Sequence, residues 1–327
     1  FLLIDYYFNF NSDETQDDLN IKRVPGFRIN RSYKIFSKTN DKQNSLKSES
    51  LGWVLKRNSH IEVKINIPYF KEDDTVEYYL NDLGCRSNVS DVKNSNIKEF
   101  TGFFGCSITY GHGLNEVETY PYLLSKKIED LNYLNFAVPG YSTYQSLETF
   151  KCKLKEVKFN KIVLGIHRDL ERRNTCSISW SKIINNFWGI PSMIDLKFLN
   201  LKFKPRFIYK NKFGLFITKI FCEVLNFLRF FLGSIRFIQK NTQKKLLLDF
   251  KDVCEQNDIE LIIICLDNYN EIFDFLTDHK FNWTTSNISL TEKNVNGEYV
   301  WQKMPWDNHP NFNANKINLT AFIVSLK

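Results

Sequence analysis

From Glu99 onward, the sequence alternates between short apolar runs and longer segments of helical periodicity. The apolar runs, which predict buried strands, cover 103–104, 134–138, 161–166 and 259–266. The segments of helical periodicity cover 120–131, 144–157, 242–256 and 314–325. Alternation of this kind predicts an α/β fold in which a parallel sheet lies between two layers of helices. Active sites of such sheets lie where the carboxyl ends of the strands meet.

The first part of the chain follows a different pattern. Residues 9–58 are polar and irregular, whereas 60–67 and 75–80 alternate polar and apolar side chains. The alternation predicts two strands of a small antiparallel unit. A stretch rich in Ser, Asn, Lys and Asp at 88–98 marks a domain boundary. The predicted parts are a β-rich appendage over 1–97 and a main domain over 98–327.

The first strand of the main domain runs into a turn of small residues that contains Cys106 and Ser107. A turn of this kind lifts one side chain off the end of a sheet, and here that side chain is Ser107. Its hydroxyl is an oxygen nucleophile when a base stands beside it. Gly140 and His167 also follow predicted strands, so we expect them at the same edge of the sheet as Ser107.

A base and an acid stand together near the other end of the chain. Only five histidines are present, and His309 lies two residues after Asp307 in a loop just before the last helix. Alone, an Asp-x-His pair in a polar loop is more often solvated surface. Together with a serine that follows a strand in an alternating fold, it predicts a triad in which His309 is the base of Ser107 and Asp307 orients it.

Three segments jointly resemble the sequence blocks of the SGNH (GDSL-type) hydrolases. They stand in the family's order, and the resemblance covers 99–327. They are the nucleophile block at 105–111 (Gly-Cys-Ser-Ile-Thr-Tyr-Gly), the second block at 135–142 and the last block at 307–311 (Asp-Asn-His-Pro-Asn). Residues 51–53 and 81–86 are similar to the N-terminal segment of a bacterial, often membrane-anchored branch. The resemblance implies the flavodoxin-like SGNH fold and cleavage of ester bonds.

The resemblance also implies an oxyanion hole. The backbone N–H groups of Ser107 and Gly140 would hold the oxyanion of the tetrahedral intermediate. The family's third block, Gly-x-Asn-Asp, falls at 165–169, where no asparagine stands. His167 or Arg168 is a candidate third donor in its place.

The alternative for His167 and Arg168 is a structural one, in which they close the strand and pair with Asp169 or Glu171. A second departure from the family pattern is Cys106, which stands where the family usually has Asp. We interpret Cys106 as a small buried side chain rather than as a second nucleophile.

An insertion interrupts the alternation at about 175–240. Residues 197–212 carry six basic and no acidic side chains, and 213–238 are apolar apart from one stripe of polar residues at helical spacing. We expect a helix packed against the main domain. A lid over the site and a peripheral membrane contact through 197–238 are the alternatives.

Composition narrows the function only a little. A net charge of +7 permits an anionic partner without requiring one, and we expect no nucleic-acid partner. Seven scattered cysteines without a Cys-x-x-Cys motif argue against a zinc site and a disulfide scaffold, so we expect no metal and no cofactor. The chain starts at Phe1, so we expect either a cytoplasmic protein or one anchored to a membrane by a segment upstream.

The resulting hypothesis is a serine esterase that removes acetyl or related acyl groups from a glycan or a small ester. Two other interpretations stay open. In an O-acyltransferase that modifies a surface glycan, a sugar hydroxyl would replace water in resolving the acyl-enzyme. In a catalytically impaired binding module, the fold would be kept without the activity.

Overall fold

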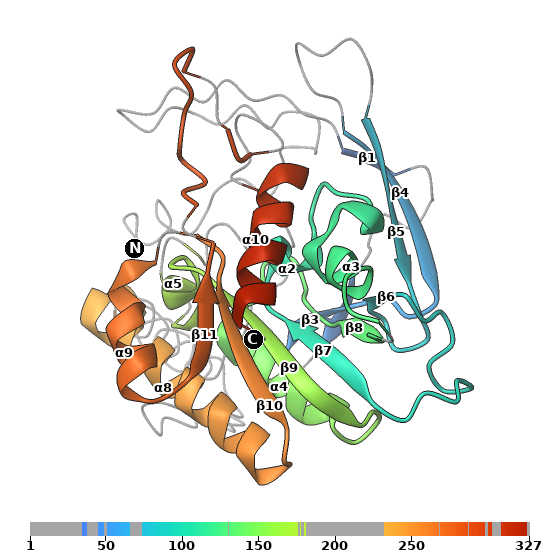
Figure 1. Cartoon of the computed structure of the whole chain (residues 1–327), viewed down its shortest axis with the longest axis horizontal. Coiled ribbons are helices and arrows are strands. Elements are labelled where there is room, and N and C mark those ends of the chain that lie inside the picture. The colour runs from blue at the N-terminus through green and yellow to red at the C-terminus, as the bar shows by residue number, and fades with distance from the viewer. Residues whose placement is uncertain are drawn as a thin grey trace, which may run out of the picture.

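The computed structural model describes residues 35–37, 45–48, 51–65, 74–129, 131–175, 177, 180, 232–267, 269–286, 288–297, 300–302 and 309–325. Within these residues, a six-stranded sheet forms the centre of the main domain (Figure 1). In spatial order its strands are β11 (Asn282–Thr285), β10 (Glu260–Cys265), β9 (Phe159–Ile166), β7 (Phe100–Phe104), β8 (Tyr133–Asn135) and β6 (Arg86–Ser87). Neighbouring strands are parallel, except that β6 runs antiparallel to β8. Strand β6 lies within the predicted appendage 1–97 and forms one edge of this sheet. The expected α/β fold is confirmed, with a sheet that is mostly rather than wholly parallel.

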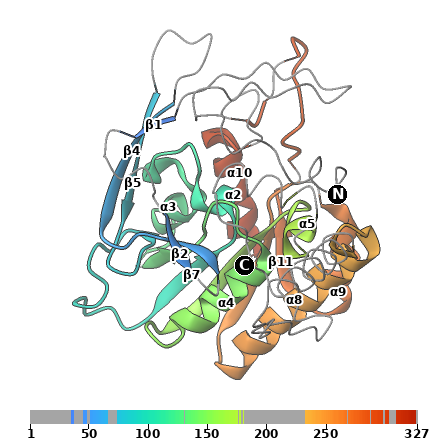
Figure 2. The same cartoon turned by 180° about the vertical axis from the view of Figure 1, so that it is seen from behind.

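Helices cover both faces of the sheet and give the expected three layers. On one face lie α4 (Thr143–Lys153), α5 (Leu170–Asn174) and α8 (Arg236–Gln256), and on the other lie α3 (Tyr120–Ser125) and α10 (Phe312–Ser325) (Figures 1 and 2). The short helix α9 (Phe273–Asp278) packs beside α8. With both faces covered, the strands bury apolar side chains on both sides, as the continuous apolar runs predict.

Aromatic packing fixes the strand that carries the nucleophile turn. All five residues of β7 are buried. The ring of Phe104, the last of them, packs edge-on against Phe150 of α4 at 5.4 Å and against Phe250 of α8 at 6.2 Å. Phe150 and Phe250 stack on each other at 5.2 Å. Because each buried aromatic ring removes a large apolar area from water, this cluster holds the end of β7 firmly against the helices.

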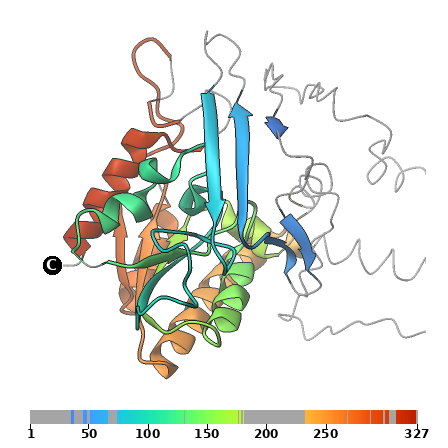
Figure 3. The same cartoon turned by 90° about the vertical axis from the view of Figure 1, so that its right-hand side faces the viewer.

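The N-terminal part forms the expected antiparallel unit, with β4 (Ser59–Ile65) paired to β5 (Asp74–Leu80). A third strand, β1 (Ile35–Ser37), pairs with β4, and β2 (Ser45–Ser48) forms a separate pair with β3 (Gly52–Leu55). Figure 3 shows β4 and β5 along one side of the main domain.

These N-terminal strands share two apolar clusters with the main domain. Val76 and Tyr78 of β5 pack with Tyr110 and Ala137. Trp53 of β3 is fully buried, donates from Nε1 to the carbonyl of Pro139 at 3.2 Å, and packs with residues of the main domain. Both contacts reach segments next to the predicted site, so the appendage supports that region.

Several elements differ from those expected from the sequence. Helix α3 ends at Ser125 rather than near 131, and α8 begins at Arg236 rather than near 242. The sequence did not predict β11, nor the short helices α5, α9 and α2 (Ser107–Tyr110). Segments of four to six residues are too short to show a helical period.

The insertion lies largely outside the described residues. Of 197–238, only 232–238 are described, and they lead into and begin α8. The membrane contact therefore stays a prediction. In the described part of the chain, no helix combines the length and the apolar character that crossing a bilayer requires.

Candidate active site

The nucleophile turn begins at Gly105, directly after β7. Its φ of 148° lies in a region that side chains disfavour, and an added Cβ would lie 2.6 Å from Thr109 Oγ1 and 2.9 Å from the Gly165 carbonyl. The chain then enters α2 (Ser107–Tyr110), which Gly111 caps in the left-handed conformation. Ser107 thus stands at the first position of a one-turn helix, at the edge formed by the carboxyl ends of the strands, and is 7% exposed. We call this edge the carboxyl edge.

The second block is bonded to this turn. The side chain of Asn135, the last residue of β8, donates to the Thr109 carbonyl at 2.8 Å, and the Val138 N–H donates to the Gly105 carbonyl at 3.3 Å. Gly140 is buried and has a φ of 84°, a left-handed conformation that suits glycine. Ser142 then caps α4 by accepting from the Gln145 N–H. The structure therefore places Gly140 at the carboxyl edge, on a segment tied to the Ser107 turn.

The last block also reaches the Ser107 turn. His309 is half-buried, and its ring centroid lies 4.7 Å from that of His112. His112 follows α2, and its backbone N–H donates to the Ser107 carbonyl at 2.9 Å. Asp307 lies outside the described residues. Of the predicted triad, the structure thus brings together the segments that carry Ser107 and His309.

Two asparagines hold the segment after His309. Asn311 donates from its backbone to the Trp301 carbonyl at 2.8 Å and caps α10 by accepting from the Ala314 N–H at 3.0 Å. Asn315, fully buried in α10, accepts from the Tyr120 N–H at 3.1 Å. Because Tyr120 begins α3, this bond links α10 to the segment that follows the nucleophile turn. The position of His309 is therefore set by bonds on its C-terminal side.

The side chains after β9 take different directions. His167 is 7% exposed, and its Nε2 lies 3.1 Å from the Sγ of Cys106. Arg168 is half-exposed and pairs with Glu271 at 3.1 Å rather than with Asp169 or Glu171. The structural alternative is therefore wrong about the partner of Arg168. Of the two candidate oxyanion donors, His167 is the one whose side chain contacts the nucleophile turn.

The acidic residues after β9 have other partners. Asp169 pairs with Arg173 at 2.7 Å and with Arg172. Burial raises the pKa of Asp169, but Arg173, His167 and Arg172 outweigh it and lower the pKa to about 2. Glu171 is buried and accepts from the hydroxyl of Tyr269. Asp169 is thus an anion at neutral pH, close enough to His167 to interact with it.

Sequence reasoning missed the role of Arg86. This side chain of β6 is 1% exposed and donates to three backbone carbonyls at 3.0–3.2 Å. They belong to Tyr110, Gly111 and Leu114. Its guanidinium lies over the rings of Tyr78 and Tyr110 at 5.2 and 5.3 Å. Arg86 therefore fixes the segment that follows Ser107 and carries His112. The only sequence signal was its place in 81–86, one of the two stretches that resemble the N-terminal segment of the bacterial branch.

We expect Arg86→Met to lower the free energy of unfolding by about 3 kcal/mol, because three buried carbonyls lose a charged donor. Urea titration followed by circular dichroism measures the change. Arg57→Met is the matched control. Arg57 makes a half-exposed ion pair with Glu156 at 3.2 Å, which is worth about 1 kcal/mol at most. Equal losses in the two variants would contradict the role assigned to Arg86.

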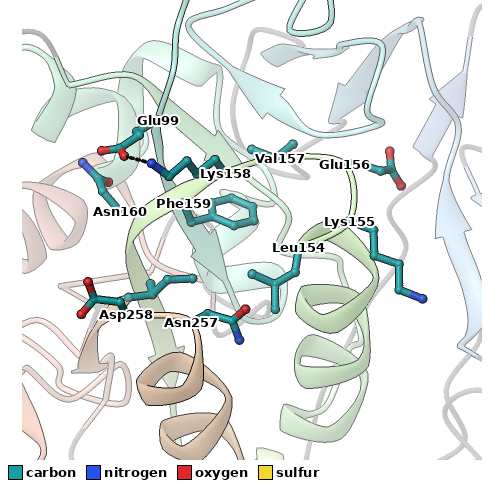
Figure 4. Close-up of a pocket in the computed structure, with 11 residues that line it drawn as sticks. Glu99, Leu154, Lys155, Glu156, Val157, Lys158, Phe159, Asn160, Asn257 and Asp258 are labelled. Carbon is teal, nitrogen blue, oxygen red and sulfur yellow. Dashed lines mark ion pairs between the residues drawn. The ribbon is translucent and has the colours of Figure 1, made fainter.

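A hollow of about 640 Å³ lies at the opposite edge of the sheet (Figure 4). It is lined by Glu99, 154–160 and 257–259, which include the residues that lead into β7, β9 and β10. An ion pair between Glu99 and Lys158 stands at its side. Because these are the amino ends of the strands, the hollow is separate from the candidate site. In the described parts of the chain, no group of three or more His, Cys, Asp or Glu side chains is arranged to hold a metal ion.

Comparison with known proteins adds little to this geometry. No family model matches the chain, and no curated protein matches it. A solved GDSL-like lipase from Bacteroides thetaiotaomicron is 10% identical, with a TM-score of 0.40, over 72% of this chain and 91% of its own. A member of the lipolytic G-D-S-L family from Veillonella parvula is 11% identical, with a TM-score of 0.40, over 69% of this chain and 97% of its own.

A catalytic mutant of an acetylxylan esterase from Geobacillus stearothermophilus is 10% identical, with a TM-score of 0.34, over 70% of this chain and 94% of its own. The α/β assignment rests on the strand order and register of the chain itself.

Proposed function

We propose that this chain is a serine hydrolase of the SGNH type that cleaves carboxylic esters through Ser107, His309 and Asp307. The observation that carries the proposal is the contact of His309 with His112, whose N–H is bonded to the Ser107 carbonyl. It brings an imidazole from the far end of the chain to the segment of the candidate nucleophile. A serine at the carboxyl edge of a parallel sheet with an imidazole nearby has the parts of an activated oxygen nucleophile.

In the proposed reaction, the Ser107 hydroxyl attacks the ester carbonyl while His309 takes its proton. His309 then gives that proton to the leaving alcohol, and Asp307 fixes the tautomer of the ring and stabilises its cation. The N–H groups of Ser107 and Gly140 hold the oxyanion, each lowering the barrier by about 3 kcal/mol. Water, activated by His309, then hydrolyses the acyl-enzyme and releases the acid.

The preferred substrate is an acetyl or similarly short acyl ester on a glycan or a small molecule. The low exposure of Ser107 favours a short acyl group, because a bulky one would need more room at the hydroxyl. An O-acyltransferase would form the same acyl-enzyme and differ only in the acceptor. A binding module of the same fold would form none.

We expect a fluorophosphonate probe to label the native protein at Ser107, because the probe reacts with a serine only where a base activates it. Peptide mass spectrometry locates the adduct, and heat-denatured protein, in which the site is lost, is the unlabelled control. Absence of labelling would overturn the hydrolase and favour the binding module. Incubation with p-nitrophenyl acetate and a sugar then separates released acetate from acetylated sugar, and predominant sugar acetylation would favour the transferase.

A further inference from the structure

Two departures from the family pattern touch each other in the structure. Cys106 stands in the nucleophile block in place of the usual Asp, and His167 stands in the third block, which lacks its asparagine. The Sγ of Cys106 lies 3.1 Å from the Nε2 of His167, and both side chains are buried. They meet because β7 and β9 are neighbours, with Phe104 opposite Leu164. Cys106, two residues beyond the end of β7, is therefore level with Ile166 at the end of β9, and His167 is the next residue. Ser107 is the next residue after Cys106.

The charges around this contact favour a thiolate. Arg173 of α5 and the backbone N–H of Ile108 both stabilise a negative charge on the Cys106 sulfur. Burial raises the pKa of the Cys106 thiol, but His167, Arg173 and the Ile108 N–H outweigh it and leave the pKa at about 6. The other buried cysteines of the described chain behave differently, since burial raises their pKa. They are Cys85, Cys254 and Cys265.

Two further titratable groups lie nearby. Asp169, paired with Arg173, also interacts with His167. Tyr120 of α3 is buried, and both burial and the charge of Cys106 raise its pKa, so it stays neutral. The pKa of Cys106 is therefore nearer to neutral pH than the pKa of Asp169 or of Tyr120.

We propose that Cys106 and His167 form a thiolate–imidazolium pair that makes His167 the third hydrogen-bond donor of the oxyanion hole. The inference rests on the proposed ester hydrolysis at Ser107. The thiol proton moves from Sγ to Nε2, so the pair as a whole gains no charge and no bond forms to the sulfur. Nε2–H then bonds to the thiolate, and Nδ1–H is the donor for the oxyanion. Cys106 is a positioning residue in this scheme, and His167 is a catalytic one.

The other nearby donors are engaged elsewhere. Arg168 forms an ion pair with Glu271, which also pairs with Arg236 and Lys240. Asn174 donates to Gln243 and accepts from the Tyr144 N–H, inside the junction of α4, α5 and α8. His167 is the donor whose contact joins it to the nucleophile turn.

The protonation state is tested without any substrate. Thiolates absorb at 240 nm, so the difference spectrum between the wild type and Cys106→Ser isolates this one cysteine. We expect its absorbance to rise with a midpoint near pH 6. The same titration is repeated without His167, as the difference spectrum between His167→Ala and the double variant His167→Ala/Cys106→Ser. The midpoint for Cys106 should then move to about pH 8.5 or above, because the cation that stabilises the thiolate is gone. A wild-type midpoint above pH 8 would overturn the pair.

The catalytic role is tested by kinetics on p-nitrophenyl acetate. We expect His167→Ala to lower kcat about a hundredfold with little change in KM, as for one lost oxyanion donor. His167→Asn, which keeps an N–H donor, should recover part of that loss. Adding Cys106→Ser to His167→Ala should not lower kcat any further, because Cys106 acts through His167. Cys152→Ser, an exposed cysteine of α4, is the control and should leave kcat unchanged.

Undiminished kcat in His167→Ala would overturn the role of His167, and a full additional loss on adding Cys106→Ser would overturn the coupling. Thermal melts of each variant distinguish a loss of donor from a loss of fold. If the wild type cleaves no ester, the proposed function fails, while the absorbance titration still decides whether the pair exists.

Discussion

Ser107→Ala should lower kcat/KM for p-nitrophenyl acetate by about four to six orders of magnitude, because no acyl-enzyme can form without the hydroxyl. The fold should persist. Ser107 begins a helix of one turn, and alanine has the higher helix propensity. Initial rates and a thermal melt on the same preparations separate lost chemistry from lost structure.

A matched control is Ser125→Ala, which removes the same hydroxyl from the last residue of α3. That hydroxyl donates to the Tyr122 carbonyl at 2.8 Å and has no part in the proposed site. We expect full activity from this variant. If Ser107→Ala retained wild-type activity, the nucleophile would have to be another residue, and a normal melting temperature would make that conclusion firm.

The elements that the sequence predicted are those long enough to show either a continuous apolar run or a helical period. The strands β9 and β10 and the helices α4 and α8 each carry enough consecutive residues to show a period or a continuous run. The elements that it missed are short or only partly buried. Strand β11 has four residues, one exposed and the rest half-buried, so its residues carry no burial pattern.

The sequence predicted that the candidate site lies at the carboxyl edge of the sheet, but it did not predict which side chains there contact one another. The positions of Ser107, Gly140 and His167 after strands sufficed to expect them at the carboxyl edge. The contact of Cys106 with His167 depends on the register between β7 and β9, which no local pattern fixes. The same holds for Arg86, whose hydrogen-bond partners are backbone carbonyls and so leave no side-chain signature.

Besides His167, two histidines, His112 and His309, lie near the nucleophile turn, and substituting each of them tests which one is the base. The rings of His112 and His309 are 4.7 Å apart, so removing either one changes the surroundings of the other. The two rings belong to different segments of the chain. His112 comes just after α2, whereas His309 lies in the loop before α10. By the proposed mechanism, His309 transfers protons and His112 packs against it.

We expect His309→Ala to lower kcat/KM by about four orders of magnitude, because Ser107 loses its general base. His112→Ala should lower kcat/KM only about tenfold, because the His309 ring is then held less firmly. Added imidazole should restore part of the activity of His309→Ala, since removal of a half-buried ring leaves a space that a small base from solvent can enter. The surface variant His60→Gln, which loses a half-exposed contact with Glu77, should match the wild type. A larger loss in His112→Ala, with imidazole rescue in that variant instead, would identify His112 as the base and overturn the assignment of His309.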